Sequence, residues 1–315
     1  MSLLYAILII AAVIIVVVPV IAYICFRMAF YVPQRSKIPH EEYDIPKGRA
    51  YDAYREKMIS WIKETQALPH EEMTITSFDG LTLWGNYYEY APGSIVEIMF
   101  HGYRGNAKRD LCGGVQRCFK LGHSALIVDQ RCSRRSDGSV ITFGINESRD
   151  CLDWVNFAIQ HFGPDVRIIL TGISMGAATV MIAAGEDLPK NVIGVLADCG
   201  YTSAKDIICK VIRQMKFPPK LFYPFVKLGA KIFGGFDLER TSPIEAMKRC
   251  NVPVIFFHGE TDNYVPCSMS LENYNACTAR KKLVTVPLAD HGLSIMFDPT
   301  GYRAAMKEFF ESDDT

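Results

Sequence analysis

The sequence predicts an α/β domain built on a mostly parallel sheet, and three observations point to it. From residue 95 to the C-terminus, short apolar runs typical of buried strands alternate with longer stretches typical of helices. Continuous apolar strands separated by helices form parallel sheets, so we expect helices on both faces. Two alternating segments joined by Asp79-Gly80 add an antiparallel hairpin at the front. The 315 residues are enough to bury the core of such a domain.

The predicted elements follow one another in regular order. The hairpin strands are Met73–Phe78 and Leu81–Tyr88, and the later strands are Ile95–Phe100, Ala125–Asp129, Val166–Thr171, Val192–Ala197, Val252–His258 and Lys282–Pro287. The predicted helices are Ala107–Leu121, Asn146–His161, Met175–Ala184 and Tyr302–Glu311. Residues 202–240 carry no strand pattern. We expect them to form a small helical cap above the C-terminal edge of the sheet, where ligands bind in open α/β folds. Two helices packed at the side are the alternative.

The N-terminal segment predicts a transmembrane anchor over residues 1–26. Leu3 through Cys25 include no charged residue, and at about 1.5 Å per residue such a helix can cross a bilayer core of roughly 30 Å. A cleaved signal peptide is the alternative, but the start lacks a basic residue and no cleavage site follows. Lys and Arg come only after the span, so the positive-inside rule predicts a single-pass membrane protein with its large domain facing the cytoplasm. An exported domain on a membrane tether is the alternative. The lipid bilayer is therefore an expected partner.

The remaining chain divides into a linker region with a juxtamembrane helix, residues 27–70, and a large domain, residues 71–315. Within the linker, Arg49–Gln66 has a helical pattern with one apolar face, which we expect to pack on the domain rather than on a membrane. Lys plus Arg and Asp plus Glu each total 34, so the formal net charge is zero. This balance argues against a nucleic-acid partner. Most of the ten cysteines lie in or beside apolar segments, as reduced core thiols do.

The most informative motif is Gly172-Ile173-Ser174-Met175-Gly176, which joins a predicted strand to a predicted helix. A serine between two glycines at such a turn is typical of a nucleophile elbow. The turn leaves no room for side chains two residues before and two residues after the serine, which accounts for both glycines. A serine that only caps the helix is the alternative. The strand before the motif and the helix after it favour the nucleophile.

A nucleophilic serine needs a histidine as base and an acid that orients the histidine. His291 is the last histidine and follows the last long strand across a short loop, which is the chain order Ser, acid, His of hydrolases with this elbow. Asp262 follows an earlier strand, and we predict it as the acid. Glu260 in the same loop and Asp198 at another strand end are alternatives. Asp290 is adjacent to His291, so its side chain should diverge from the imidazole.

An oxyanion formed on the substrate needs two backbone donors. The amide of Met175, directly after the serine, is the first candidate. The second should come from the loop His101–Asn106, which follows the strand Ile95–Phe100, and we predict the amide of Tyr103. His101 lies beside a glycine turn, which suits a supporting role better than that of a base.

These segments together resemble the α/β-hydrolases, specifically the membrane-anchored serine hydrolases related to serine aminopeptidases and monoacylglycerol lipases. The resemblance covers residues 72–311 and is carried by His101-Gly102, Asp129-Gln130-Arg131, Ile141-Thr142-Phe143-Gly144, Gly172-Ile173-Ser174-Met175-Gly176, Asp198-Cys199, His258-Gly259-Glu260-Thr261-Asp262 and Asp290-His291. It implies an α/β-hydrolase fold, a triad of Ser174, Asp262 and His291, and neither a metal nor an organic cofactor. One segment departs: Cys132-Ser133-Arg134-Arg135 stands where the branch usually has a small residue, histidine and glycine. The substrate contacts of that loop therefore stay open.

The sequence thus predicts a membrane-anchored serine hydrolase that cleaves an acyl ester or thioester through an acyl-enzyme. A peptidase of the same fold, cutting short peptides from the amino end, is one alternative. Lysines and arginines in the predicted cap disfavour it, because such a peptidase would bind a free amine with carboxylates. A non-enzymatic membrane scaffold is the other alternative, and it would require a broken triad.

Overall fold

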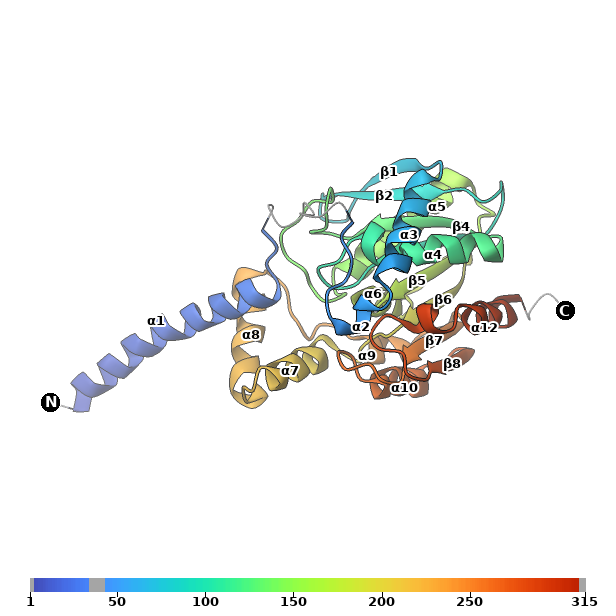
Figure 1. The fold of residues 1–315 in the computed structure, drawn as a ribbon. Coiled ribbons are helices and arrows are strands. Elements are labelled where there is room, and N and C mark those ends of the chain that lie inside the picture. Colours follow the sequence, from blue (N-terminus) through green and yellow to red (C-terminus); the bar gives the residue numbers. More distant parts are fainter. Residues whose placement is uncertain (1–2, 34–42, 312–315) are drawn as a thin grey trace.

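The fold is seen in a computed structural model that describes residues 3–33 and 43–311. Eight strands of the described chain form one sheet in the order β1-β2-β4-β3-β5-β6-β7-β8 (Figure 1). The strands are β1 (Glu71–Thr76), β2 (Thr82–Tyr88), β3 (Val96–Phe100), β4 (Ser124–Asp129), β5 (Ile168–Ile173), β6 (Val192–Asp198), β7 (Val254–Gly259) and β8 (Lys281–Val286). The hairpin β1–β2 is antiparallel, β2 pairs antiparallel with β4, and the strands from β4 to β8 are parallel. The predicted mixed sheet is therefore present.

The helices cover both faces of the sheet. The helices are α1 (Leu3–Ala29), α2 (Arg49–Asp52), α3 (Arg55–Ala67), α4 (Ala107–Leu121), α5 (Glu147–Phe162), α6 (Met175–Ala183), α7 (Ala204–Gln214), α8 (Pro219–Phe233), α9 (Pro243–Met247), α10 (Cys267–Ala276), α11 (Ser294–Phe297) and α12 (Pro299–Glu311). Helix α4 contacts β3, β4, α3 and α12, whereas α6 contacts β3, β5, β6, α5 and α9. The sheet thus lies between two helical layers.

Strand β3 shows why its segment is apolar throughout. Its five residues are all buried. Ile98 and Phe100 belong to the core cluster on the α5–α6 side, while Met99 between them packs with residues of α4. Because successive side chains of a strand point to opposite faces, a strand covered on both faces needs apolar residues at nearly every position.

The predicted strand and helix positions agree with the structure to within about three residues, and α4 has the predicted bounds. Helices α9, α10 and α11 were not predicted. With four and five residues, α11 and α9 are too short to show a helical period. The helix expected over residues 49–66 is divided into α2 and α3.

The predicted transmembrane anchor gains no support from the structure. Within the part of the chain that is described, no helix combines the length and the apolar character needed to cross a membrane. Residues 1 and 2, and the side chains of residues 3, 4 and 6–14, lie outside the description. The last turns of α1 pack against protein instead: Ala22 and Phe26 are buried, and Gly229 of α8 approaches the carbonyl of Ala22 so closely that a Cβ would clash there. In Figure 1, α1 reaches the domain only at this end.

Candidate active site

The predicted nucleophile elbow has the expected strained backbone. Ser174 lies between β5 and α6 with φ 56° and ψ −115°, a region that a residue with a side chain rarely adopts. A Cβ on Gly172 would lie 2.1 Å from the carbonyl oxygen of Gly176, and a Cβ on Gly176 would lie 2.0 Å from that of Phe100. Both glycines are thus required by backbone contacts, as the motif predicts.

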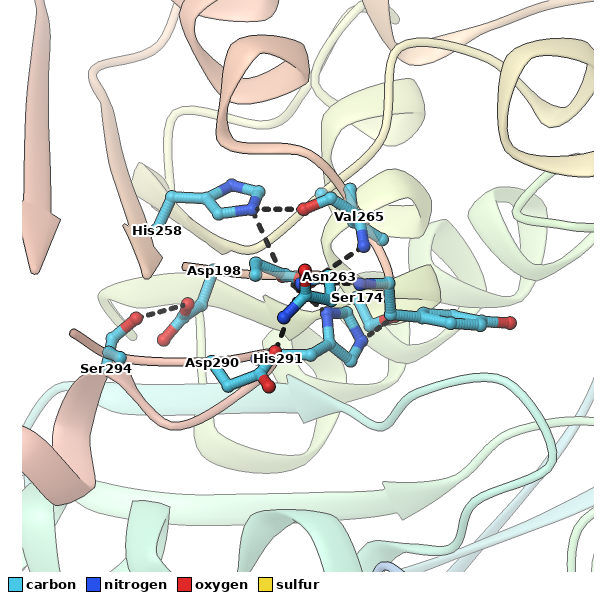
Figure 2. A network of polar contacts seen from close by, with 12 residues as sticks. Ser174, Asp198, His258, Asn263, Val265, Asp290, His291 and Ser294 are labelled. Carbon is cyan, nitrogen blue, oxygen red and sulfur yellow. Dashed lines mark hydrogen bonds and ion pairs between the residues drawn. The ribbon is translucent and has the colours of Figure 1, made fainter. Parts of the chain in front are cut away.

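The structure brings the three predicted triad residues together, and Figure 2 shows two of them, Ser174 and His291, side by side. His291 Nε2 lies 2.9 Å from Ser174 Oγ, and His291 Nδ1 lies 2.7 Å from Asp262 Oδ2. The second oxygen of Asp262 accepts the backbone N–H groups of Tyr264, at 2.8 Å, and Val265, at 2.7 Å. An ionised carboxylate only accepts hydrogen bonds, so the proton of a neutral His291 belongs on Nδ1. Nε2 is then free to accept the proton of the serine.

Asp262 also contacts a second histidine. His258 Nε2 lies 3.2 Å from Asp262 Oδ2 and 2.8 Å from the carbonyl oxygen of Val265, while its Nδ1 lies 2.6 Å from the hydroxyl of Ser270. Because Nε2 faces two acceptors, it carries the proton. Burial opposes ionisation of Asp262, but hydrogen bonds from His258 and His291 outweigh it and hold the pKa of Asp262 below its ordinary range. The sequence indicated only a structural part for His258, at the end of a strand.

The other acids near the triad have different partners. Asp290 Oδ1 accepts the backbone N–H groups of Asn263, at 3.1 Å, and His291, at 2.7 Å. The Asp290 carboxylate thus diverges from the imidazole, as adjacency in the sequence predicts. Glu260 is exposed and accepts from the hydroxyl of Thr285. Neither competes with Asp262 for His291.

Asp198 lies beneath the site. Its carboxylate accepts from the hydroxyl of Ser294, at 3.2 Å (Figure 2), and from that of Tyr302, at 3.0 Å. Burial raises the pKa of this carboxyl. Its backbone oxygen accepts from the N–H of Ser174, at 2.8 Å. Asp198 therefore supports the serine turn through its main chain.

The two predicted oxyanion donors flank the serine. Met175 is the first residue of α6, directly after Ser174. A Cβ on Gly102 would lie 3.5 Å from the Cβ of Ser174, so the loop that carries Tyr103 lies against the nucleophile. Tyr103 and Ser174 also line the same cavity. Both residues that carry the predicted donors therefore lie beside the serine.

His101 supports this loop, as its sequence position suggests. The ring is buried, with Nε2 accepting from the N–H of Gln130 at 3.0 Å and Nδ1 lying 2.8 Å from the carbonyl oxygen of Gly102. Burial lowers the pKa of His101, which favours the neutral ring that this pair of contacts requires. His101 is therefore a structural residue of the loop.

A cavity of about 530 Å³ opens at Ser174 and His291, within the range of ordinary ligand sites. Its lining comprises Pro46, Lys47, Ala50, Tyr51, Met58, Trp61, Gly102, Tyr103, Arg109, Asp110, Gly113, Gly114, Ile173, Ser174, Asn263, Tyr264, Asp290, His291, Gly292, Ile295 and Met296. The α2–α3 segment thus forms one wall. None of the lining residues comes from α7 or α8, so the predicted cap does not form this cavity. The sequence suggested that the face of the helix over 49–66 packs on the domain, but gave no sign that it lines the site.

The loop that departs from the family pattern lies apart from this cavity. Arg135 pairs with Glu72 and lies over the ring of Trp84, 3.4 Å from its centroid. Arg134 lines a separate cavity of about 210 Å³. Neither arginine lines the cavity at Ser174, so an anionic group bound there would not meet them.

One group among the described residues has the ligand spacing of a metal site: Cys199, Asp262 and His291, with ligand atoms within 4.8 Å of one another. Both nitrogens of His291 already have protein partners. Burial raises the pKa of Cys199 well above its ordinary value, so its thiol stays protonated. This chemistry suits a triad better than a set of metal ligands.

No family model matches the chain. It is 25% identical over 193 residues to the uncharacterized protein YqkD of Bacillus subtilis, a match that covers 61% of this chain and 63% of that protein, less than two thirds of its length. Among solved structures, the esterase Pf2001 of Pyrococcus furiosus has a TM-score of 0.64 at 19% identity, covering 87% of this chain and 99% of that one. The α/β hydrolase GrgF from Penicillium sp. sh18 has a TM-score of 0.62 at 17% identity, covering 78% and 99%. The chain therefore has the α/β-hydrolase fold.

Proposed function

We propose that the protein is a serine hydrolase that cleaves a carboxylic ester or thioester. The observation that carries this proposal is the chain of contacts from Ser174 Oγ to His291 Nε2, at 2.9 Å, and from His291 Nδ1 to Asp262 Oδ2, at 2.7 Å. A serine on a strained turn, a histidine in the right tautomer and an ionised acid are the parts that acyl transfer needs.

The reaction follows from these contacts. Ser174 Oγ attacks the acyl carbonyl while its proton passes to His291 Nε2, and the carbonyl oxygen becomes an oxyanion held by the amides of Met175 and Tyr103. The tetrahedral intermediate collapses: the bond to the leaving group breaks, and His291 returns the proton to the departing oxygen or sulfur. Water then attacks the acyl-serine by the same route and releases the acid. Asp262 stays ionised and stabilises the imidazolium at each step.

The lining of the cavity supports an ester or thioester with an apolar acyl group. Apolar side chains from segments far apart in the sequence line the cavity, among them Met58, Trp61, Ile173, Ile295 and Met296. The Asp110 carboxylate in the wall is bound by Arg109 and by the N–H of Gly102. An apolar acyl chain fits such a wall better than a charged amine does, which favours an ester over an N-terminal peptide.

Labelling with a fluorophosphonate tests the proposal. The purified full-length protein should become modified at Ser174, and Ser174→Ala should neither be labelled nor hydrolyse aryl esters. Aryl esters of graded chain length, acyl thioesters and aminoacyl amides would then rank the substrates. Preference for aminoacyl amides would support a peptidase instead. Absence of labelling in a folded sample would contradict a hydrolase and favour a scaffold.

We further propose that the N-terminal segment associates with a lipid bilayer and that the hydrolase domain faces the cytoplasm. The support is the uncharged stretch Leu3–Cys25, the Lys and Arg that follow it, and exposed apolar side chains on α1 such as Ile15, Val16 and Val20. Retention in the membrane pellet after carbonate washing, with the domain accessible to protease only in opened cells, is the expected result. Release by the wash would contradict an integral attachment.

A further inference from the structure

The end of α1 meets the loop that follows β3. Arg104 Nη2 donates to the carbonyl oxygens of Met28, at 2.9 Å, and Tyr31, at 3.1 Å. The Tyr103 hydroxyl donates to the carbonyl oxygen of Ala29, at 2.7 Å. The last carbonyls of a helix have no partner within the helix, and a cation there also interacts favourably with the helix dipole. Two neighbouring residues of one loop thus cap the C-terminal end of α1.

The loop that makes these contacts is strained. Arg104 has φ 52°, in the left-handed region that residues with a side chain seldom adopt. Gly105 N–H bonds to the carbonyl of Gly102, at 3.1 Å, and Gly105 has no room for a Cβ because Asp110 lies against it. Strained backbone persists only where its surroundings hold it. Asp110 holds the loop on one side, and the carbonyls of α1 hold it on the other.

The end of α1 is itself fixed to the domain. Tyr31 forms a β-bridge with Val140, and the neighbouring bonds run from Val32 N–H to Ser139 O, at 2.8 Å, and from Ile141 N–H to Phe30 O, at 2.9 Å. The Phe30 side chain is fully buried. The helix end is therefore a rigid support for the loop rather than a free tail.

The same loop reaches the nucleophile. Gly102 lies against Ser174, and the Tyr103 amide follows it. The Tyr103 ring packs on Phe143, with centroids 5.1 Å apart, and Phe143 packs on Phe30, at 5.7 Å. Hydrogen bonds and aromatic contacts thus run without interruption from the end of α1 to one side of the serine.

We propose that the C-terminal turn of α1 positions the oxyanion loop, with Arg104 and the Tyr103 hydroxyl as the positioning groups. The inference rests on the proposed function, because it assigns the Tyr103 amide to the oxyanion. Without these bonds, the strained turn relaxes and the amide moves from the place where the oxyanion forms. Such a donor acts in the transition state, so its displacement lowers kcat and leaves KM nearly unchanged.

The test compares the full-length double variant Tyr103→Phe, Arg104→Gln with the wild type. Both changes keep the backbone amide; they remove the bonds to α1 and the contact of the Arg104 guanidinium with the Tyr103 ring. We expect kcat for an aryl ester to fall about tenfold or more, with KM within about twofold and fluorophosphonate labelling slowed in parallel. Arg280→Gln is the matched control: Arg280 Nη1 donates to the carbonyl of Phe309 near the end of α12, at 2.8 Å and remote from the cavity. This control should keep the kcat of the wild type.

The outcomes separate this inference from the proposed function. A wild type that shows neither Ser174-dependent hydrolysis nor labelling would overturn both. An active wild type and a double variant with the same kcat would overturn only the positioning role. Equal losses in the double variant and in Arg280→Gln would also overturn it, because they would reflect general destabilisation. Circular dichroism monitors folding, and Arg104→Gln alone serves if the double variant does not fold, because the Arg104 side chain is exposed.

Discussion

Two helical segments flank the candidate site, and they serve it differently. The N-terminal segment α2–α3 contributes Tyr51, Met58 and Trp61 to the cavity wall. The insertion α7–α8, the segment the sequence predicts as a cap, contributes no lining residue. It packs against α1 instead, and Lys210 of α7 reaches the carbonyl oxygens of Asn263 and Tyr264 beside the triad acid. One segment forms a wall of the pocket, and the other supports the loop that carries Asp262.

An insertion that follows a strand can therefore lie near the C-terminal edge of the sheet without covering the candidate site. Each segment also binds the main chain at or beside a different residue of the proposed triad. The Tyr51 hydroxyl donates to the carbonyl oxygen of His291, at 2.9 Å, while Lys210 binds the residues that follow Asp262. Changes in α2–α3 should therefore act on substrate binding and on the base, and changes in α7 only on the acid.

The largest loss of activity is expected from a change at Asp262 itself, and the effects of changes in the two segments can be compared with it. Asp262→Asn should lower kcat by about 10³- to 10⁴-fold, because an amide there favours the wrong tautomer of His291. Steady-state kinetics with an aryl ester would measure it. A loss below tenfold would show that another carboxylate orients the histidine, and Glu260→Gln, a change at an exposed side chain, is the control.

The second-largest effect should come from displacing the pocket wall that α3 forms. Trp61 of α3 packs on Gly113 of α4, where a Cβ would lie 2.5 Å from two ring carbons. Gly113→Ala should push α3 outward and raise KM about tenfold, since such a clash costs about 1–3 kcal/mol. Gly185→Ala is the matched control, because its Cβ would meet Ala246 at 2.7 Å, away from the cavity. Equal KM values for the two variants would show that the α3 wall does not bind substrate.

Loss of the hydrogen bond between α2 and the proposed base, His291, should have a smaller effect on catalysis. Tyr51→Phe removes one hydrogen bond to the carbonyl oxygen of His291, a loss of about 1 kcal/mol. We expect kcat/KM to fall about fivefold, and the ring should keep its place in the wall. Unchanged kcat/KM would mean that the loop of His291 is held without α2.

Loss of the contacts between α7 and the loop of the proposed acid, Asp262, should have the smallest effect on the reaction rate. Lys210 is half-buried, but its bonds to Asn263 and Tyr264 lie at the surface, where water can replace them. Lys210→Met should lower kcat by about twofold to threefold and leave KM unchanged. A rise in KM in this variant would contradict the division of roles, because it would mean that α7 contacts the substrate.

The lowered pKa of Asp262 should also affect how the stability of the protein depends on pH. The pKa of Asp262 is lowered from its ordinary value of 3.8 in the folded protein, because the hydrogen bonds from His258 and His291 outweigh burial. The unfolded state therefore binds the proton at higher pH, and the stabilisation is present above pH 3.8 and lost as pH falls through the folded pKa. Urea unfolding below about pH 4 should show a steeper loss of stability for the wild type than for Asp262→Asn. Equal slopes would contradict the lowered pKa.

Features that depend on neighbouring residues could be predicted from the sequence. The strand and helix patterns and the serine turn each lie in a short segment, and the order of serine, acid and histidine follows from where such segments occur along the chain. Ser174, Asp262 and His291 come together because each ends or follows a parallel strand, and the C-terminal ends of such strands lie along one edge of the sheet. The glycines at 172 and 176 follow from the backbone of a single turn.

Only the tertiary structure decided which segments surround the serine. Tyr51 binds the main chain of a residue 240 positions away, Arg104 caps a helix end 76 positions before it, and His258 shares the carboxylate of Asp262 with the triad histidine. No periodicity encodes these contacts, because an exposed tyrosine and a buried one look alike in a short pattern. They arise from the packing of whole helices against one another, and packing depends on shapes brought together from distant parts of the chain.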